Sequence, residues 1–91
     1  MISFFAEFVH TENGVLCSDS GFLDLYSAEE CSSAVNYAKS FNGNARYKGV
    51  FSSSISHKGC AIYDSGNMYF NPHSTGGRRS DEISICRKGI T

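Results

Sequence analysis

The stretch Ser27–Gly43, SAEECSSAVNYAKSFNG, decides the fold of this chain of 91 residues. It predicts a helix from about Ala28 to Phe41. Ser27 stands at the N-cap position with Glu30 three residues later, which is the sequence signature of a capping box. Gly43 ends the helix, because glycine tolerates the left-handed backbone conformation that follows a helix terminus. We therefore expect one well-defined helix near the end of the first half of the chain.

One face of this helix carries small and apolar side chains at helical spacing: Cys31, Ala34, Val35 and Ala38. Small side chains let a helix lie close to a β-sheet, so this face is expected to pack inward. Cys31 then lies on the buried side of the helix.

Strand-like segments surround the helix, because they are rich in β-branched and aromatic residues. They are predicted at Phe4–Val9 and Val15–Cys17 before the helix, and at Arg46–Ser52, Cys60–Tyr63, Met68–Asn71 and Glu82–Cys86 after it. The turn cluster Asp64–Asn67 joins two of them as a hairpin. The result is a single α+β domain over residues 1–91, with one α-helix packed on a small, mainly antiparallel β-sheet and stapled by two disulfides.

The chain has four cysteines, Cys17, Cys31, Cys60 and Cys86, and no two of them form a C-x-x-C pair. An even number of widely spaced cysteines in a small domain is typical of two disulfides formed in an oxidising compartment, extracellular or lumenal. Four cysteines allow three pairings. The pattern favours Cys31–Cys60, because the helix must cover the strand that Cys60 begins. It also favours Cys17–Cys86, because terminal strands of a compact domain commonly meet.

Few side chains in the sequence suit catalysis or metal binding. Two disulfides leave no free thiol to act as a nucleophile, and the adjacent acids Asp81 and Glu82 point in different directions on a strand. His57 stands three residues before Cys60, but structural zinc sites normally show two short-spaced ligand pairs. We therefore expect no catalytic residue, no metal and no cofactor, and the chain is not expected to be an enzyme.

Charge is divided unevenly between the two halves of the chain. Residues 1–41 hold six acidic side chains and one lysine, a net charge of −5, whereas residues 42–91 hold seven basic and three acidic side chains, a net charge of +4. Attraction between the halves is the simpler interpretation, and a patch for an acidic ligand is the alternative. The overall charge of −1 favours neither nucleic acid nor a membrane surface, and no apolar stretch approaches the ~20 residues of a membrane span.

The polar, glycine-rich loop His73–Asp81 is the best candidate for ligand binding. Arg78 and Arg79 carry guanidinium groups that suit sulfate, phosphate or carboxylate, and His73 begins the loop. A solvated connection is an equally good interpretation of this loop. Tyr69 precedes it and belongs to a group of aromatic side chains that are candidates for a sugar-binding or partner-binding platform: Tyr47, Tyr63, Tyr69 and Phe70. At least half of such strand residues are expected to face the core.

Residues 17–86 resemble the PAN/apple-like class of small extracellular modules. The resemblance lies in Cys31 on the helix, in Cys60 within the segment Gly59–Tyr63, and in the Cys17/Cys86 pair at the two ends. The segments between Ser52 and Cys86 are also similar to small cysteine-bearing domains of unassigned role in marine algae and protists. The PAN/apple resemblance implies a helix disulfide-bonded to a central strand, and a module that binds protein or carbohydrate without catalysis.

Two functions are therefore expected. The first is a non-catalytic extracellular or lumenal binding module for a protein or an anionic glycan. The alternative is a structural subunit of a larger extracellular or thylakoid-lumenal assembly, docked through Phe4, Phe5 and Phe8 of the N-terminal strand. An aromatic groove beside Arg78 and Arg79 favours glycan binding, whereas an exposed apolar N-terminal strand favours the subunit.

Overall fold

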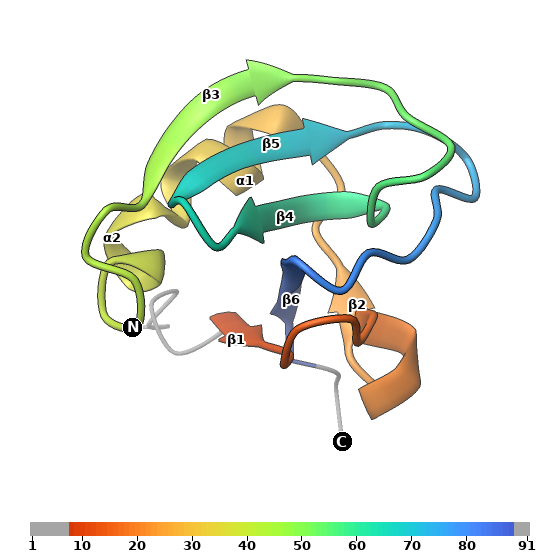
Figure 1. Cartoon of the computed structure of the whole chain (residues 1–91), viewed down its shortest axis with the longest axis horizontal. Coiled ribbons are helices and arrows are strands. Elements are labelled where there is room, and N and C mark those ends of the chain that lie inside the picture. Colours follow the sequence, from red (N-terminus) through yellow and green to blue (C-terminus); the bar gives the residue numbers. More distant parts are fainter. Residues whose placement is uncertain (1–7, 89–91) are drawn as a thin grey trace, which may run out of the picture.

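A six-stranded sheet and two short α-helices form the part of the chain that the computed structural model describes, residues 8–88 (Figure 1). The strands are β1 (Phe8–His10), β2 (Leu23–Asp24), β3 (Arg46–Val50), β4 (Gly59–Tyr63), β5 (Asn67–Asn71) and β6 (Glu82–Arg87). The helices are α1 (Ala28–Ser33) and α2 (Val35–Ala38), and the 3₁₀ helix η2 spans Cys17–Ser20. The predicted α+β class is confirmed.

The middle strand of the sheet is β4, since the strands follow the order β1-β6-β4-β5-β3. β4 pairs antiparallel with β5, as the predicted hairpin requires, and also with β6. β1 and β2 both pair antiparallel with β6, so the first and last strands are neighbours. β3 instead runs parallel to β5, and the two arrows point the same way in Figure 1. The sheet is therefore mainly, but not wholly, antiparallel.

The predicted single helix is wrong: the segment divides into α1 and α2 at Ala34, and α2 ends at Ala38 rather than at Phe41. At Ala34 the backbone has φ −85° and ψ 1°, outside the usual helical range. Its N–H donates to the Cys31 carbonyl at 3.1 Å, a three-residue spacing that tightens the last turn of α1. The two helices together still cover one face of the sheet (Figure 1).

The predicted start of the helix is confirmed. The Ser27 hydroxyl oxygen accepts a hydrogen bond from the backbone N–H of Glu30 at 3.1 Å. The Glu30 carboxylate accepts from the N–H of Tyr26 at 2.7 Å, so the return bond reaches one residue further back than in a standard capping box. Near the other end, the Ser33 hydroxyl donates to the Glu30 carbonyl at 2.7 Å, a local bond by which serine competes with the helical backbone.

The segment before the helix departs from the prediction. Val15–Cys17 is not a strand, because the Asp19 carboxylate accepts the N–H of Leu16 at 2.9 Å and the chain turns there into η2. Gly21, with φ 77°, ends η2 and redirects the chain into β2, a strand that the sequence analysis does not predict. β2 pairs with the end of β6, beyond the part of β6 that pairs with β4.

The core lies between the helices and the covered face of the sheet. Its buried members are mostly small or aliphatic: Leu25, Cys31, Ala34, Ala38, Ala45, Cys60, Ile62, Met68 and Ile85. The Cys31–Cys60 disulfide crosses this core and ties α1 to the middle strand β4. The Cys17–Cys86 disulfide ties η2 to β6. Both predicted pairings are confirmed, and the small side chains of α1 and α2 explain how the helices approach the sheet closely.

The N-terminal strand is described only from Phe8, so Phe4 and Phe5 of the expected docking surface lie outside the described residues. Phe8 itself is partly buried against the core, and its ring centroid lies 5.8 Å from that of Tyr37. Phe8 therefore packs within the domain.

Ion pairs join the acidic first half of the chain to the basic second half. Arg78 pairs with Asp19, Arg87 pairs with Glu30, and the Lys58 ammonium lies 4.0 Å from the Asp24 carboxylate. The attraction expected from the divided charge is therefore realised as specific contacts. Within residues 8–88, no helix has the length and apolar character needed to cross a membrane.

Candidate functional site

Alternation along the strands divides the aromatic side chains between the two faces of the sheet. Tyr47 and Phe70 pack against the core on the face that the helices cover. Tyr63 and Tyr69 lie on the opposite face, where Phe51 joins them just after the end of β3. The expected platform therefore keeps two of its four rings, and Phe51 supplies a third.

These three rings and the side chain of Asn67 line a groove of about 310 Å³, which we call the aromatic groove. The ring centroids of Tyr63 and Tyr69 are 5.8 Å apart in an edge-to-face contact, and those of Phe51 and Tyr69 are 5.9 Å apart. Edge-to-face and tilted contacts of this kind are favourable, so they help to orient the rings. The Oδ1 atom of Asn67 is buried and has no hydrogen-bond partner among the described residues.

Arg79 lies at one side of the aromatic groove. Its guanidinium carbon is 5.6 Å from the centroid of the Tyr63 ring, within the range of a cation–π contact. The same guanidinium donates to both carboxylate oxygens of Asp81, at 2.9 and 3.0 Å, and its Nε lies 3.6 Å from the buried carboxylate of Glu82. Arg79 lowers the pKa of the Asp81 carboxyl. The structure thus brings Arg79 and Tyr69 to one surface, with Arg79 already paired to acids.

Arg78 has a different set of contacts. Its guanidinium pairs with both carboxylate oxygens of Asp19 and donates to the Gly14 carbonyl at 2.9 Å. The hydrogen bond from Arg78 lowers the pKa of Asp19 to about 2. Arg78 therefore fastens the glycine-rich loop to η2, and it does not line the aromatic groove.

His73 shapes the loop in which it lies. Its Nδ1 atom accepts hydrogen bonds from the backbone N–H of Gly76 at 2.9 Å and of Thr75 at 3.2 Å. The backbone N–H of His73 donates to the side-chain oxygen of Asn71 at 3.1 Å. Of the four predicted binding residues, the structure brings Tyr69 and Arg79 together and gives Arg78 and His73 contacts that organise the loop.

A buried histidine holds this loop on the sheet. His57 is fully buried, and its backbone N–H donates to the Glu82 carboxylate at 2.8 Å. Its Nε2 lies 3.1 Å from the Arg79 carbonyl, which can only accept, so Nε2 carries the proton and Nδ1 accepts from the Ser84 hydroxyl at 2.8 Å. Burial lowers the pKa of His57. The neutral ring thus fixes the backbone that presents Arg79.

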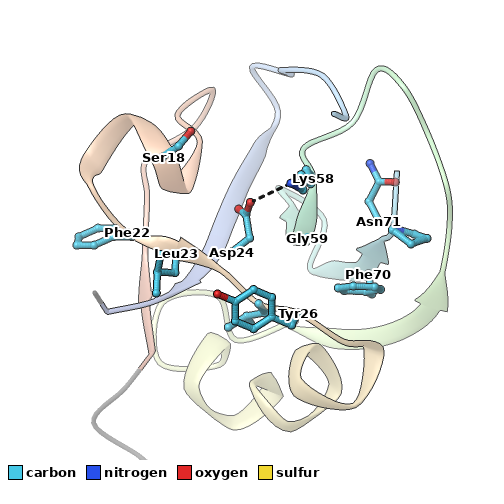
Figure 2. Close-up of a pocket in the computed structure, with 11 residues that line it drawn as sticks. Ser18, Phe22, Leu23, Asp24, Tyr26, Lys58, Gly59, Phe70 and Asn71 are labelled. Atoms are coloured by element: carbon cyan, nitrogen blue, oxygen red, sulfur yellow. Dashed lines mark ion pairs between the residues drawn. The ribbon is translucent and has the colours of Figure 1, made fainter. Parts of the chain in front are cut away.

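A separate cleft of about 420 Å³ lies near η2 and β2 (Figure 2). Residues of β2, the start of β4 and the end of β5 line it, and the facing charges of Asp24 and Lys58 stand within it. A neighbouring cavity of about 310 Å³ shares Asp24 and Lys58. This cleft could not be predicted from the sequence, because one of its walls is the unpredicted strand β2.

All four cysteines are in disulfides. In the part of the chain from residue 8 to 88, no three His, Cys, Asp or Glu side chains gather where they could hold a metal ion. Comparisons with protein-family models, with curated proteins and with solved structures find no match. The aromatic groove and the cleft are therefore the features from which a function is inferred.

Proposed function

We propose that this protein is a non-catalytic carbohydrate-binding module that works in an extracellular or lumenal, oxidising compartment, with the aromatic groove as its glycan site. The observation that carries this proposal is the arrangement of Phe51, Tyr63 and Tyr69 around the side chain of Asn67, with Arg79 beside Tyr63. An aromatic groove next to an arginine is the feature that distinguishes glycan binding from a structural role in this chain.

The groove has the two kinds of contact that a sugar ring needs. A pyranose has apolar C–H faces, which gain from leaving water and from dispersion contacts with an aromatic ring. It also has hydroxyl groups around its edge. Asn67 lines the groove, and the NH₂ group of its side chain can donate to such a hydroxyl, since its Oδ1 is closed off from solvent. A sugar ring that stacks on Phe51 and Tyr69 and places a hydroxyl group at Asn67 occupies the whole groove.

Arg79 defines what charge the glycan carries. Because Asp81 and the buried Glu82 already neutralise this guanidinium, an acidic group on the ligand has to compete with them. The ring in the groove is therefore uncharged, and a sulfate or carboxylate substituent adds a weaker contact at Arg79. Most of the affinity comes from stacking.

The architecture supports the same function. The disulfide from α1 to the middle strand β4, and the neighbouring positions of β1 and β6, agree with the PAN/apple-like resemblance and with the binding role that it implies. The two disulfides are consistent with an oxidising environment.

A glycan array tests the proposal with three proteins: the wild type, Tyr69→Ala, and the control Tyr26→Ala, which removes an exposed tyrosine outside the groove. We expect Tyr69→Ala to weaken binding of the best wild-type glycan by roughly tenfold or more, because it deletes a stacking ring. The loss should persist at high salt, since stacking is not screened.

The Arg78→Ala variant provides a second control, because Arg78 contacts Asp19 and Gly14 rather than the groove. It should bind the same glycan as the wild type does. Equal losses for Tyr69→Ala and Tyr26→Ala, or a wild type that retains no glycan of any class, would contradict the proposed function.

A further inference from the structure

The cleft of Figure 2 is a second binding site that shares no lining residue with the aromatic groove. One part of it is apolar, with Leu25 buried, Phe70 half-buried and Leu23 partly exposed. Tyr26 lines the same cleft and is 73% exposed. Asp24 and Lys58 also line the cleft, and Figure 2 shows their charged ends pointing toward each other.

Asp24 is the fixed charge of the cleft. Its side chain is 30% exposed, and its carboxylate accepts no hydrogen bond from the described residues. Backbone pairing with β6 holds it in β2, and the Cβ of Asp24 packs so closely on Gly59 that a side-chain carbon there would lie only 3.2 Å away. Burial raises the pKa of this carboxyl, since desolvation disfavours the charged form. A half-buried carboxylate without donors is an acceptor that a ligand can satisfy.

Lys58 is the movable charge. Its ammonium lies 4.0 Å from the Asp24 carboxylate, at the limit of an ion pair, and its side chain is 49% exposed. A long, half-exposed lysine side chain has many accessible rotamers, so it can turn into solvent without leaving a charge buried. Lys58 therefore acts as a loosely held counter-ion that a better donor can displace.

We propose that this cleft binds a primary ammonium group carried on an apolar stem, such as the side chain of a lysine in a partner protein or the amino terminus of a partner chain. The ammonium donates to the Asp24 carboxylate, which has free acceptor positions, and the stem packs against Leu23, Leu25 and Phe70. The exposed ring of Tyr26 supplies further contact with the cation.

An anionic ligand fits this cleft less well. It would attract Lys58 away from Asp24 and place a second negative charge beside a half-buried carboxylate that has no other donor. The fixed group in the cleft, rather than the movable one, selects the charge of the ligand. The complement of Asp24 is a cation.

Matched small molecules test the sign of the ligand directly. Titrations of the whole, oxidised protein with n-hexylammonium, hexanoate and n-hexanol, followed by NMR chemical shifts, compare the same stem with a positive, a negative and a neutral end. We expect n-hexylammonium to bind most tightly, with shifts centred on Leu23, Asp24 and Tyr26. Hexanoate binding as tightly as n-hexylammonium, or shifts elsewhere in the molecule, would overturn the proposal.

Two variants test the roles of the charged residues in opposite directions. Asp24→Asn keeps the shape of the side chain and should weaken n-hexylammonium binding roughly tenfold. Lys58→Met removes the competing ammonium and should tighten the binding of n-hexylammonium several-fold. A merely structural role for Lys58 would not produce this gain in affinity. If Asp24→Asn fails to fold, the Lys58→Met comparison still decides. Weaker binding by Lys58→Met contradicts the proposal.

The source of the ammonium is decided by two further probes. Nα-acetyl-lysine N-methylamide presents a lysine side chain, and leucine N-methylamide presents a chain amino terminus. Tighter binding of one of them assigns that source, and binding of neither overturns the inference. Because the groove lies elsewhere, Tyr69→Ala should leave all of these titrations unchanged, so failure of the glycan proposal and failure of this one are separable.

Discussion

The buried imidazole of His57 holds three parts of the molecule together. The ring bonds to the Ser84 hydroxyl on β6 and to the carbonyl of Arg79 in the glycine-rich loop. The backbone N–H of His57 donates to the carboxylate of Glu82. The neutral ring has one donor and one acceptor, and both are used. Protonation would put a second proton on Nδ1, which the Ser84 hydroxyl now occupies as a donor. Protonation of His57 therefore disturbs its bond to Ser84, whereas the bond from Nε2 to the Arg79 carbonyl is made in either state.

Stability should consequently fall on mild acidification. Burial lowers the pKa of His57 below its usual 6.5, so between the folded-state pKa and 6.5 the unfolded chain binds more protons than the folded one. The free energy of unfolding therefore increases as the pH rises through that window and decreases as the pH falls through it. Urea unfolding at pH 7.5 and pH 5 should show the loss in the wild type and a smaller loss in His57→Gln.

His10 provides the control for this pH dependence. Partial burial also lowers the pKa of His10, so this residue contributes to the pH dependence of stability in the same direction. Its ring stacks on Phe41 near the surface. His10→Gln should retain most of the wild-type pH dependence. A His57→Gln protein with an undiminished pH dependence would assign the effect to another group.

At the scale of single elements, α1 is short and depends on its first turn. It spans only six residues, and helices of this length are marginal without tertiary contacts and caps. The Ser27 side chain satisfies the N–H of Glu30, one of the four amides that the start of a helix leaves unpaired. The Cys31–Cys60 disulfide then holds the helix on β4.

Removing the cap should be measurable. Ser27→Ala leaves the Glu30 N–H without its side-chain acceptor and should lower the free energy of unfolding by about 1 kcal/mol. Ser32→Ala is the matched control, because Ser32 is exposed in the same helix and alanine is a better helix former there. Thermal unfolding of the oxidised proteins compares the two. An unchanged midpoint for Ser27→Ala would show that the cap contributes nothing.

The elements that could be predicted are those whose signals are local. The alternating segments of β4, β5 and β6 and the turn between residues 64 and 66 carry their own pattern, and so does the start of α1. β2 escapes prediction because it has two residues and exists through its pairing with β6. The break at Ala34 also escapes, because the small-residue stripe continues across it.

The candidate site also contains some residues that could be predicted from local signals and others that could not. Tyr63, Tyr69 and the glycine-rich loop could be identified from residue type. The partner of Arg78 could not be, because Asp19 lies 59 residues away in the chain. Phe51 lies in the segment Arg46–Ser52 predicted as a strand, where alternation assigns it to the same face as Tyr47. The register of β3 shifts between Tyr47 and Gly49, and Phe51 therefore joins the opposite face. Contacts between distant segments thus decide which of the predicted residues remain free to bind.

At the scale of the whole molecule, the two disulfides differ in what they constrain. Cys17–Cys86 spans 69 residues and ties η2 to β6, whereas Cys31–Cys60 spans 29 residues and lies inside that loop. In the chain-entropy model these loops correspond to about 4.4 and about 3.6 kcal/mol. Because the loops are nested, the two contributions do not add fully. Either is large beside the ~5–15 kcal/mol stability of a typical domain.

Loop length alone ranks Cys17–Cys86 first, but packing favours the opposite order. Cys31 and Cys60 belong to the buried core cluster between the helices and the sheet, and Cys17 and Cys86 do not. Cys17 and Cys86 are as fully buried as the other pair, so both double variants add a cavity cost to the lost loop constraint. The cost is larger for Cys31→Ala with Cys60→Ala, because these two cysteines lie in the main core cluster. We expect this double variant to lose at least as much stability as Cys17→Ala with Cys86→Ala, on the order of 4 kcal/mol each. Urea unfolding of both variants at one pH provides the comparison. If the Cys17/Cys86 variant is clearly the less stable, loop entropy rather than core packing governs how the disulfides stabilise this fold.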